Sequence, residues 1–123
     1  MTKTDAHLTT GRIGEDTAAA FLQRRGWRII ARNWRCAQGE LDIIARDPDG
    51  VLVVCEVKCR KGRGFGDPLE AITYDKVRRL RALVAEWMRC QESPVGRVRL
   101  DAIGVLTRHD GTSSITHVVG IDA

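Results

Sequence analysis

Two carboxylates and a lysine interrupt the apolar runs of GELDIIARDPDGVLVVCEVKCR, the segment formed by residues 39–60. Asp42 lies in the first run, whereas Glu56 and Lys58 lie in the second. Two carboxylates that meet at one point make a typical Mg²⁺ site, because this ion is usually bound through one or two carboxylates and several waters. A neighbouring ammonium group can hold a water molecule or stabilise the negative charge that develops in phosphoryl transfer. These residue types indicate metal-assisted phosphoryl chemistry, provided that the chain brings them together.

The turn DPDG, at residues 47–50, predicts how the two runs pair as strands. Proline at its second position suits a type I turn, and the glycine suits the positive φ that completes a three-residue hairpin loop. In the resulting register Asp42 lies directly opposite Glu56, and Glu40 lies opposite Lys58. Directly opposed side chains share one face of the sheet, with Cβ atoms about 5 Å apart. The turn therefore predicts that the two carboxylates converge.

Such a pair of carboxylates is unfavourable unless something compensates its charge. Opposed like charges repel across a strand pair, and Leu52 and Val54 on the same face keep this end of the sheet partly dry. A divalent cation held by Asp42 and Glu56 would remove the repulsion. The alternative is a solvated face on which Asp42 forms an ion pair with Lys58, and the E-x-K spacing alone leaves both interpretations open.

Basic residues near the proposed site predict contacts with nucleic-acid phosphates. The segment RKGRGFGD, at residues 60–67, combines basic residues with glycines, which lets cations and backbone approach phosphates. Trp34 lies between two arginines, a combination that suits phosphate contact and base stacking, although a core tryptophan is the alternative. For the other cations the alternative is a solvated loop or helix face. The candidate nucleic-acid contacts are Arg32, Arg35, Arg60, Lys61, Arg63 and Lys76.

Two segments with helical periodicity flank these strands in the chain. The first covers about 13–25, and Gly26 ends it in the usual C-terminal manner. Thr73 caps the second, expected at 74–91. Its apolar stripe forms one buried face and comprises Val77, Leu80, Leu83, Val84, Trp87 and Met88.

Five strands complete the prediction. Alternation in WRIIARNWR places Trp27, Ile29 and Ala31 on one side of the first strand. A hairpin followed by a crossover helix and a further strand implies a mixed sheet. The order αβββαββ therefore predicts an α/β fold with a mixed five-stranded sheet flanked by helices. The strands are expected at 27–35, 39–47, 51–60, 98–106 and 114–122.

The composition of the 123 residues is that of one globular domain, expected to span 9–123 after a flexible N-terminal tail at 1–8. No apolar run approaches the ~18 residues that cross a bilayer, and the N-terminus lacks the apolar core of a secretory signal. We therefore expect a cytoplasmic protein without membrane contact. A net charge of +4 permits a polyanionic partner but does not require one.

Four motifs occur together in the chain. They are GRIGE at 11–15, GELDIIA at 39–45, EVKCR at 56–60 and FGDPLEAI at 65–72. In this combination, which covers roughly residues 11–105, the sequence resembles the YraN-like family of small uncharacterised bacterial proteins. That family is placed in the PD-(D/E)xK nuclease superfamily, near Holliday-junction resolvases and restriction endonucleases.

The resemblance implies a restriction endonuclease-like fold. It also implies a nuclease that uses Mg²⁺ or Mn²⁺ to hydrolyse phosphodiester bonds of nucleic acid, with DNA expected as the substrate in preference to RNA. It assigns Asp42 to the motif aspartate and Glu56 and Lys58 to the E-x-K, so that the two carboxylates hold the metal. Leu41 stands where the superfamily motif has a proline. Glu15 would match the additional helix carboxylate of the resolvase-like branch, and the alternative is a first-turn glutamate that favours the helix dipole. The implied catalytic set is Glu15, Asp42, Glu56 and Lys58.

Three functions fit the sequence. The first is a metal-dependent nuclease, either non-specific or selective for branched DNA. The second is a nucleic-acid-binding protein that keeps the fold without cutting, and the third is a small interaction module with an incidental ion pair. A nuclease for four-way junctions would act as a homodimer, because two-fold symmetry lets it reach two strands. The sequence leaves the substrate and the oligomeric state open.

Overall fold

The computed structural model describes residues 3–62 and 67–122 and contains a five-stranded sheet. The strands lie in the order β1-β2-β3-β4-β5, with β3 and β4 parallel and the other neighbours antiparallel. The predicted α/β class with a mixed five-stranded sheet is therefore confirmed. The elements are α1 (Lys3–Arg24), β1 (Arg28–Cys36), β2 (Gly39–Arg46), β3 (Leu52–Lys61), the 3₁₀ helix η1 (Pro68–Ala71), α2 (Tyr74–Arg89), β4 (Val98–Thr107) and β5 (Ser113–Val118).

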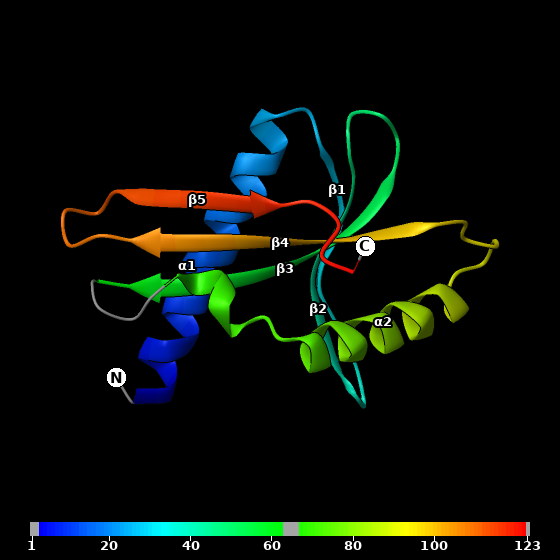
Figure 1. Ribbon diagram of the computed structural model, residues 1–123, viewed down its shortest axis with the longest axis horizontal. Helices are drawn as coiled ribbons and strands as arrows, with labels where there is room; N and C mark the ends of the chain where they lie inside the picture. The colour runs from blue at the N-terminus through cyan, green and yellow to red at the C-terminus, as the bar shows by residue number, and fades with distance from the viewer. Residues whose placement is uncertain (1–2, 63–66, 123) are drawn as a thin grey trace.

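The two α-helices pack on opposite faces of the sheet. In Figure 1, α1 passes behind β4 and β5, whereas α2 passes in front of β2. Ala18 and Leu22 of α1 pack in one core cluster with Val53 and Cys55 of β3. The residues of β3 alternate between the two faces, so Glu56 and Lys58 belong to the α2 face. The second cluster lies there and includes the predicted stripe, of which Leu80, Leu83, Val84 and Trp87 are buried.

Local signals predict most element ends to within about two residues. The two larger differences are the end of β5 and the start of α1. The side chain of Thr73 accepts a hydrogen bond from the Lys76 backbone N–H, so α2 begins where predicted. Strand β5 ends at Val118 instead of near residue 122, because the chain turns at Gly120, whose φ is 70°.

Helix α1 begins at Lys3, so it runs through most of the segment 1–8 for which we expected a flexible tail. This segment contains Ala6 and Leu8, which favour helix, and no proline that would interrupt it. Among the residues that the structure describes, no helix is both long enough and apolar enough to cross a membrane.

The first strand contains a β-bulge that its alternation pattern did not predict. The register with β2 shifts between Ile29 and Ala31. Trp27 and Ile29 pack against the α1 cluster, whereas Ala31 packs against the α2 cluster. The predicted common side for these residues is therefore wrong for Ala31, because the extra residue of a bulge reverses the alternation beyond it.

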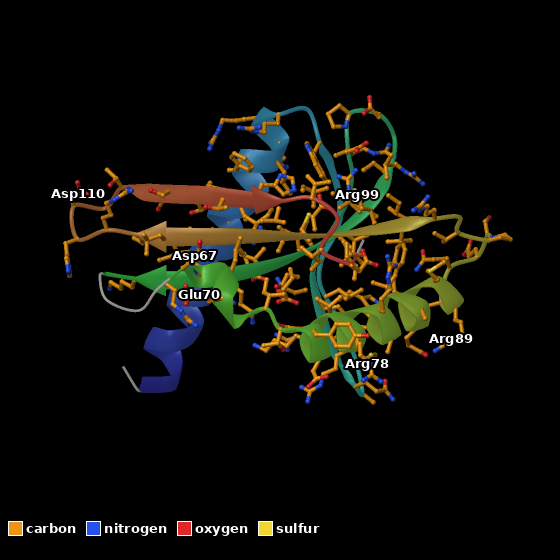
Figure 2. The ribbon with its side chains drawn as sticks, viewed as in Figure 1. Asp67, Glu70, Arg78, Arg89, Arg99 and Asp110 are labelled. Atoms are coloured by element: carbon orange, nitrogen blue, oxygen red, sulfur yellow. The ribbon has the colours of Figure 1, made fainter. Side chains whose placement is uncertain are left out.

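Asp101 has a structural role at the end of the sheet that lies near the β2–β3 turn. Its side chain is fully buried and accepts hydrogen bonds from Arg99 at 2.9 and 3.0 Å and from the Gly120 backbone at 3.0 Å, and Nε2 of His117 lies 2.8 Å away. Burial alone would raise the pKa of this carboxyl, but the hydrogen bonds hold it at about 2. Figure 2 shows Arg99 where β4 passes the β2–β3 turn, and its guanidinium also donates to Asp47 at 3.3 Å. The carboxylate therefore ties β4 to the end of β5.

Candidate functional site

Strands β2 and β3 pair over a short ladder and then separate. The pairing ends at Ile43 and Cys55, in the register that the DPDG turn predicted. Beyond this point the backbone N–H of Val57 donates to Oδ2 of Asp42 at 2.8 Å. The Asp42 side chain thus accepts the hydrogen bond that a neighbouring strand would otherwise accept from Val57. This bond holds the Asp42 carboxylate at the split, beside Glu56.

The carboxylates of Asp42 and Glu56 converge at this split. Asp42 is 8% exposed, and the side chain of Glu56 is 16% exposed. Burial, followed by a hydrogen bond with Asp42 and the Asp42 charge, raises the pKa of Glu56 to about 8. Near neutral pH the pair therefore favours a shared proton or a bound cation over two full negative charges.

Two ammonium groups lie beside Glu56. Nζ of Lys58 lies 3.9 Å from Oε1 of Glu56. Lys76 lies in the first turn of α2 and reaches the same region. The charge of Lys58, followed by burial, lowers the pKa of Lys76, which places the two ammonium groups close to each other. Within 3–62 and 67–122 the ion-pair partner of Lys58 is Glu56, so the alternative Asp42–Lys58 ion pair is not formed. Strand β3 and helix α2 therefore both place positive charge at the carboxylate pair.

Glu15 approaches Asp42 from the other face of the sheet. It lies in the middle of α1, because that helix begins at Lys3, so the first-turn interpretation of this glutamate is wrong. Burial, followed by the Asp42 charge, raises the pKa of Glu15 to about 7. The Asp42 carboxylate thus interacts with Glu15 from α1 and with Glu56 on β3.

Asn33 is a site residue that the sequence did not predict. Its φ of 55° is in the left-handed region, although it lies inside β1. Its amide nitrogen, in the orientation that satisfies both groups, lies 2.8 Å from Oε1 and 3.1 Å from Oε2 of Glu15. The amide therefore orients the Glu15 carboxylate. Asparagine is depleted in strands and enriched in left-handed conformations, which was the available signal.

Gly14 lets α1 approach β3 closely enough to present Glu15 at the split. A Cβ atom placed on the buried Gly14 would overlap with Sγ of Cys59 and would lie 3.1 Å from Cβ of Cys59. A side chain at this position would push α1 away from the strand. The glycine of the GRIGE motif therefore has a packing role next to its glutamate.

We expect Gly14→Ala to lower the free energy of unfolding by about 1–3 kcal/mol, the range for overpacked sites. The matched control is Gly11→Ala in the same helix, where an added Cβ meets nothing within 4 Å, so alanine should be neutral or stabilising. Adding Cys59→Ala to Gly14→Ala removes the overlapping sulfur and should restore part of the loss. Urea unfolding measures all four proteins, and equal effects of the two glycine substitutions would contradict this packing role.

Arg32 and Arg35 have acidic partners in the structure. Arg32 forms an ion pair with Asp16 of α1 at 2.6 Å. Arg35 lies opposite Glu40 and pairs with it at 3.0 Å. The predicted opposition of Glu40 and Lys58 is therefore wrong, because β2 and β3 separate before these residues would meet.

The other predicted nucleic-acid contacts lie along the end of β3 and the start of α2. The pKa of Lys76 is lowered mainly by the charge of Lys58 and to a smaller extent by the charge of Arg60. Arg60 therefore lies near the two site lysines. Lys61 is exposed at the end of β3, and Arg63 lies outside the described residues. Trp34 packs against the α2 cluster, in agreement with the core alternative.

The carboxylate pair suits a hard divalent cation. Mg²⁺ usually takes one or two protein carboxylates and keeps several waters. Asp42 and Glu56 supply two such ligands, and a cation would relieve the repulsion that raises the pKa of Glu56. In the part of the chain that the structure describes, no group of three or more His, Cys, Asp or Glu side chains is arranged around one metal position. The donor set therefore fits Mg²⁺ or Mn²⁺ with water completing the coordination.

Comparison with known proteins agrees with the motifs at this site. The model of the family described as "Uncharacterised protein family UPF0102" matches residues 14–105. A UPF0102 protein of Streptomyces coelicolor is 47% identical over 119 residues, which is 95% of this chain and 91% of that protein. UPF0102 proteins of Rhodococcus opacus and Acidothermus cellulolyticus are 45% and 47% identical and cover 91% and 94% of this chain, and each alignment covers 94% of the relative. The chain therefore belongs to the UPF0102 family.

Proposed function

We propose that this protein is a metal-dependent nuclease of the restriction endonuclease-like type, as the resemblance to the YraN-like family and the PD-(D/E)xK superfamily implies. The observation that carries the proposal is the convergence of Asp42 and Glu56 at the split between β2 and β3, with Lys58 beside them. A buried acidic pair of this kind destabilises the fold when both groups are charged. A role in holding a cation explains why the chain places it there.

Asp42 and Glu56 would hold the ion, and Mg²⁺ or Mn²⁺ supplies neutralisation of the scissile phosphate and activation of a water when bound. The Val57 N–H that donates to Oδ2 of Asp42 fixes the direction of this carboxylate. Lys58 orients the attacking water or stabilises the charge of the pentavalent phosphorus in the transition state. These roles need no movement of the β2–β3 ladder.

Glu15 is suited to moving a proton at this site. Its raised pKa of about 7 is in the range in which a carboxylate accepts a proton efficiently near neutral pH. Asn33 holds both oxygens of Glu15 and so limits the orientation of the carboxylate. Lys76, from α2, adds a second cation that can contact a phosphate of the substrate.

Nucleic acid is the expected substrate, with DNA preferred to RNA. Arg60 and Lys61 extend the positive charge of the site beyond the carboxylates. Arg32 and Arg35 already have acidic partners, so we expect smaller contributions from them. The second candidate function is nucleic-acid binding without cleavage. It is favoured by Lys58, Lys76, Arg60 and Lys61, whose positive charge along the end of β3 and the start of α2 can contact phosphates without the carboxylate pair.

A cleavage panel tests this proposal. Branched, duplex and single-stranded DNA and RNA of equal length are incubated with the purified protein in Mn²⁺, in Mg²⁺ and in EDTA. We expect cleavage of at least one DNA substrate that EDTA abolishes. Retention of DNA that weakens with salt, without cleavage in either metal, would instead support the binding function.

A further inference from the structure

A groove lies at the end of the sheet opposite the last residues of β3. It has a volume of about 1280 Å³ and lies between the start of β1, the β2–β3 turn and the connection from α2 to β4. Figure 1 shows the β2–β3 turn and the α2–β4 connection at the same end of the molecule. Lys76 lies in the first turn of α2, whereas Trp87 and Cys90 reach the groove from the last turn. The helix therefore connects the candidate site with the groove.

The walls of the groove are strongly basic. Two acidic residues line it, Glu92 and Asp122, against five arginines. Asp122 pairs with Arg81, and Arg99 is held by Asp101 and Asp47. Among the described residues, the arginines of the groove without an ion-pair partner are Arg28, Arg46 and Arg97.

Arg28 and Arg46 lie directly opposite each other on β1 and β2. Like charges in this position are destabilising, because directly opposed side chains are only about 5 Å apart. Within residues 3–62 and 67–122 neither arginine forms an ion pair, and the hydrogen bond of the Arg46 guanidinium goes to the neutral Gly50 carbonyl at 2.8 Å. An anion bound between the two guanidinium groups would remove the repulsion, and Arg97 faces the same space from the α2–β4 connection.

The groove suits an extended polyanion. All three arginines are exposed, so the charge is distributed over an open surface and is not concentrated at one buried point. Arg46 lies four residues after Asp42 on β2, which is about 13 Å at ~3.3 Å per residue. That distance corresponds to about 4 base pairs of duplex at ~3.4 Å each.

We propose that the arginine groove, defined by Arg28, Arg46 and Arg97, binds the phosphate backbone of a duplex arm of the nucleic-acid substrate about 4 base pairs from the candidate active site. This inference rests on the proposed function for the position of the cut, but binding at the groove does not need the carboxylates. Binding at the groove would make the affinity of the protein depend on the length of the duplex arm, in addition to its cleavage activity. A substrate with a short arm can reach the carboxylates without reaching the groove.

Binding in EDTA tests the groove without cleavage. Fluorescence anisotropy is measured with branched DNA whose arms have 4, 8, 12 and 16 base pairs, for the wild type and for Arg28→Gln/Arg46→Gln/Arg97→Gln. We expect wild-type affinity to rise at least about tenfold between the shortest arms and the 12-base-pair arms. In the variant this rise should disappear, and the slope of log affinity against log salt should fall by about 3. The control with equal loss of charge is Arg24→Gln/Arg89→Gln/Arg108→Gln, which lies outside the groove and should keep the rise.

The outcomes separate this inference from the proposed function. One outcome is that affinity depends on arm length, that this dependence requires the three groove arginines, and that the protein cleaves none of the substrates. This outcome supports the groove and contradicts the proposed nuclease activity. Cleavage by a wild type whose affinity is the same for all arm lengths overturns the groove alone. An equal loss of affinity in the control variant, or competition by polyglutamate as strong as that by DNA, also overturns it.

Discussion

Asp42→Asn and Glu56→Gln will each reduce metal-dependent cleavage by at least about 100-fold, a loss that corresponds to about 3 kcal/mol of transition-state stabilisation. Each substitution replaces a carboxylate with a neutral amide of nearly the same shape. The amide oxygen introduced at position 42 can still accept the Val57 N–H, so the split between β2 and β3 should be retained. The loss should appear in kcat measured at saturating Mn²⁺ on the best substrate of the panel.

The control for this prediction is Glu86→Gln on α2. Glu86 pairs with Arg89 in the last turn of that helix, so its substitution should leave cleavage within about threefold of wild type, less than ~0.7 kcal/mol. Lys58→Met should lower kcat with little change in metal affinity, because in the proposed mechanism the lysine acts on water or phosphate and is not a metal ligand. Cleavage that survives both Asp42→Asn and Glu56→Gln would show that it comes from another site or another protein.

The metal-free protein will lose stability as the pH rises from 5 to 8, and metal will oppose the loss. In the unfolded chain Glu56 releases its proton near its ordinary pKa of 4.5, whereas burial beside Asp42 keeps the proton on the folded protein until about pH 8. Between these values the folded state binds the extra proton, so the free energy of unfolding falls with rising pH. The slope is at most about 1.4 kcal/mol per pH unit for this one group.

Urea unfolding in EDTA at pH 5, 6, 7 and 8 measures this slope. Glu56→Gln should remove the part of the slope that Glu56 contributes and leave the part from Glu15, whose pKa is also raised, to about 7. The variant should be more stable than the wild type at pH 8, because the amide has no charge to bury. Glu86→Gln serves again as the control and should keep the slope, because Glu86 pairs with Arg89 and not with the site carboxylates. Mn²⁺ should restore stability at pH 8 in the wild type and not in Glu56→Gln. Asp101 titrates with its pKa at about 2, so it contributes only at more acidic pH and does not affect this range. A wild type whose stability is flat across the range would contradict the buried acidic pair.

The central geometry of the candidate site could be predicted from one turn. The residues DPDG determine loop length, loop length determines register, and register places Asp42 beside Glu56. The stripe of α2 and its Thr73 cap were equally predictable, because helical periodicity and capping act over a few residues. The motifs that resemble the YraN-like family drew attention to Glu15, whose position next to Asp42 no local pattern could predict.

Other features depend on segments that are distant in the sequence. The bulge between Ile29 and Ala31 arises from pairing with β2, and alternation within one strand does not reveal it. Likewise, the need for glycine at position 14 arises from Cys59 on a strand that follows two others, and the role of Asn33 arises from a helix carboxylate that packs against it.

The local code of turns, caps and periodicity was thus sufficient for the class of fold, for the register of β2 with β3 as far as Ile43 and Cys55, and for the meeting of two acidic side chains just beyond it. The packing of α1 on β3, the surroundings that raise the pKa of Glu56, and the arginine groove emerge from the folded chain. The physical reason is the distance along the chain over which each signal acts. Turn and helix signals act between neighbours in the chain, whereas burial and the electrostatic environment depend on which distant segments the fold brings into contact.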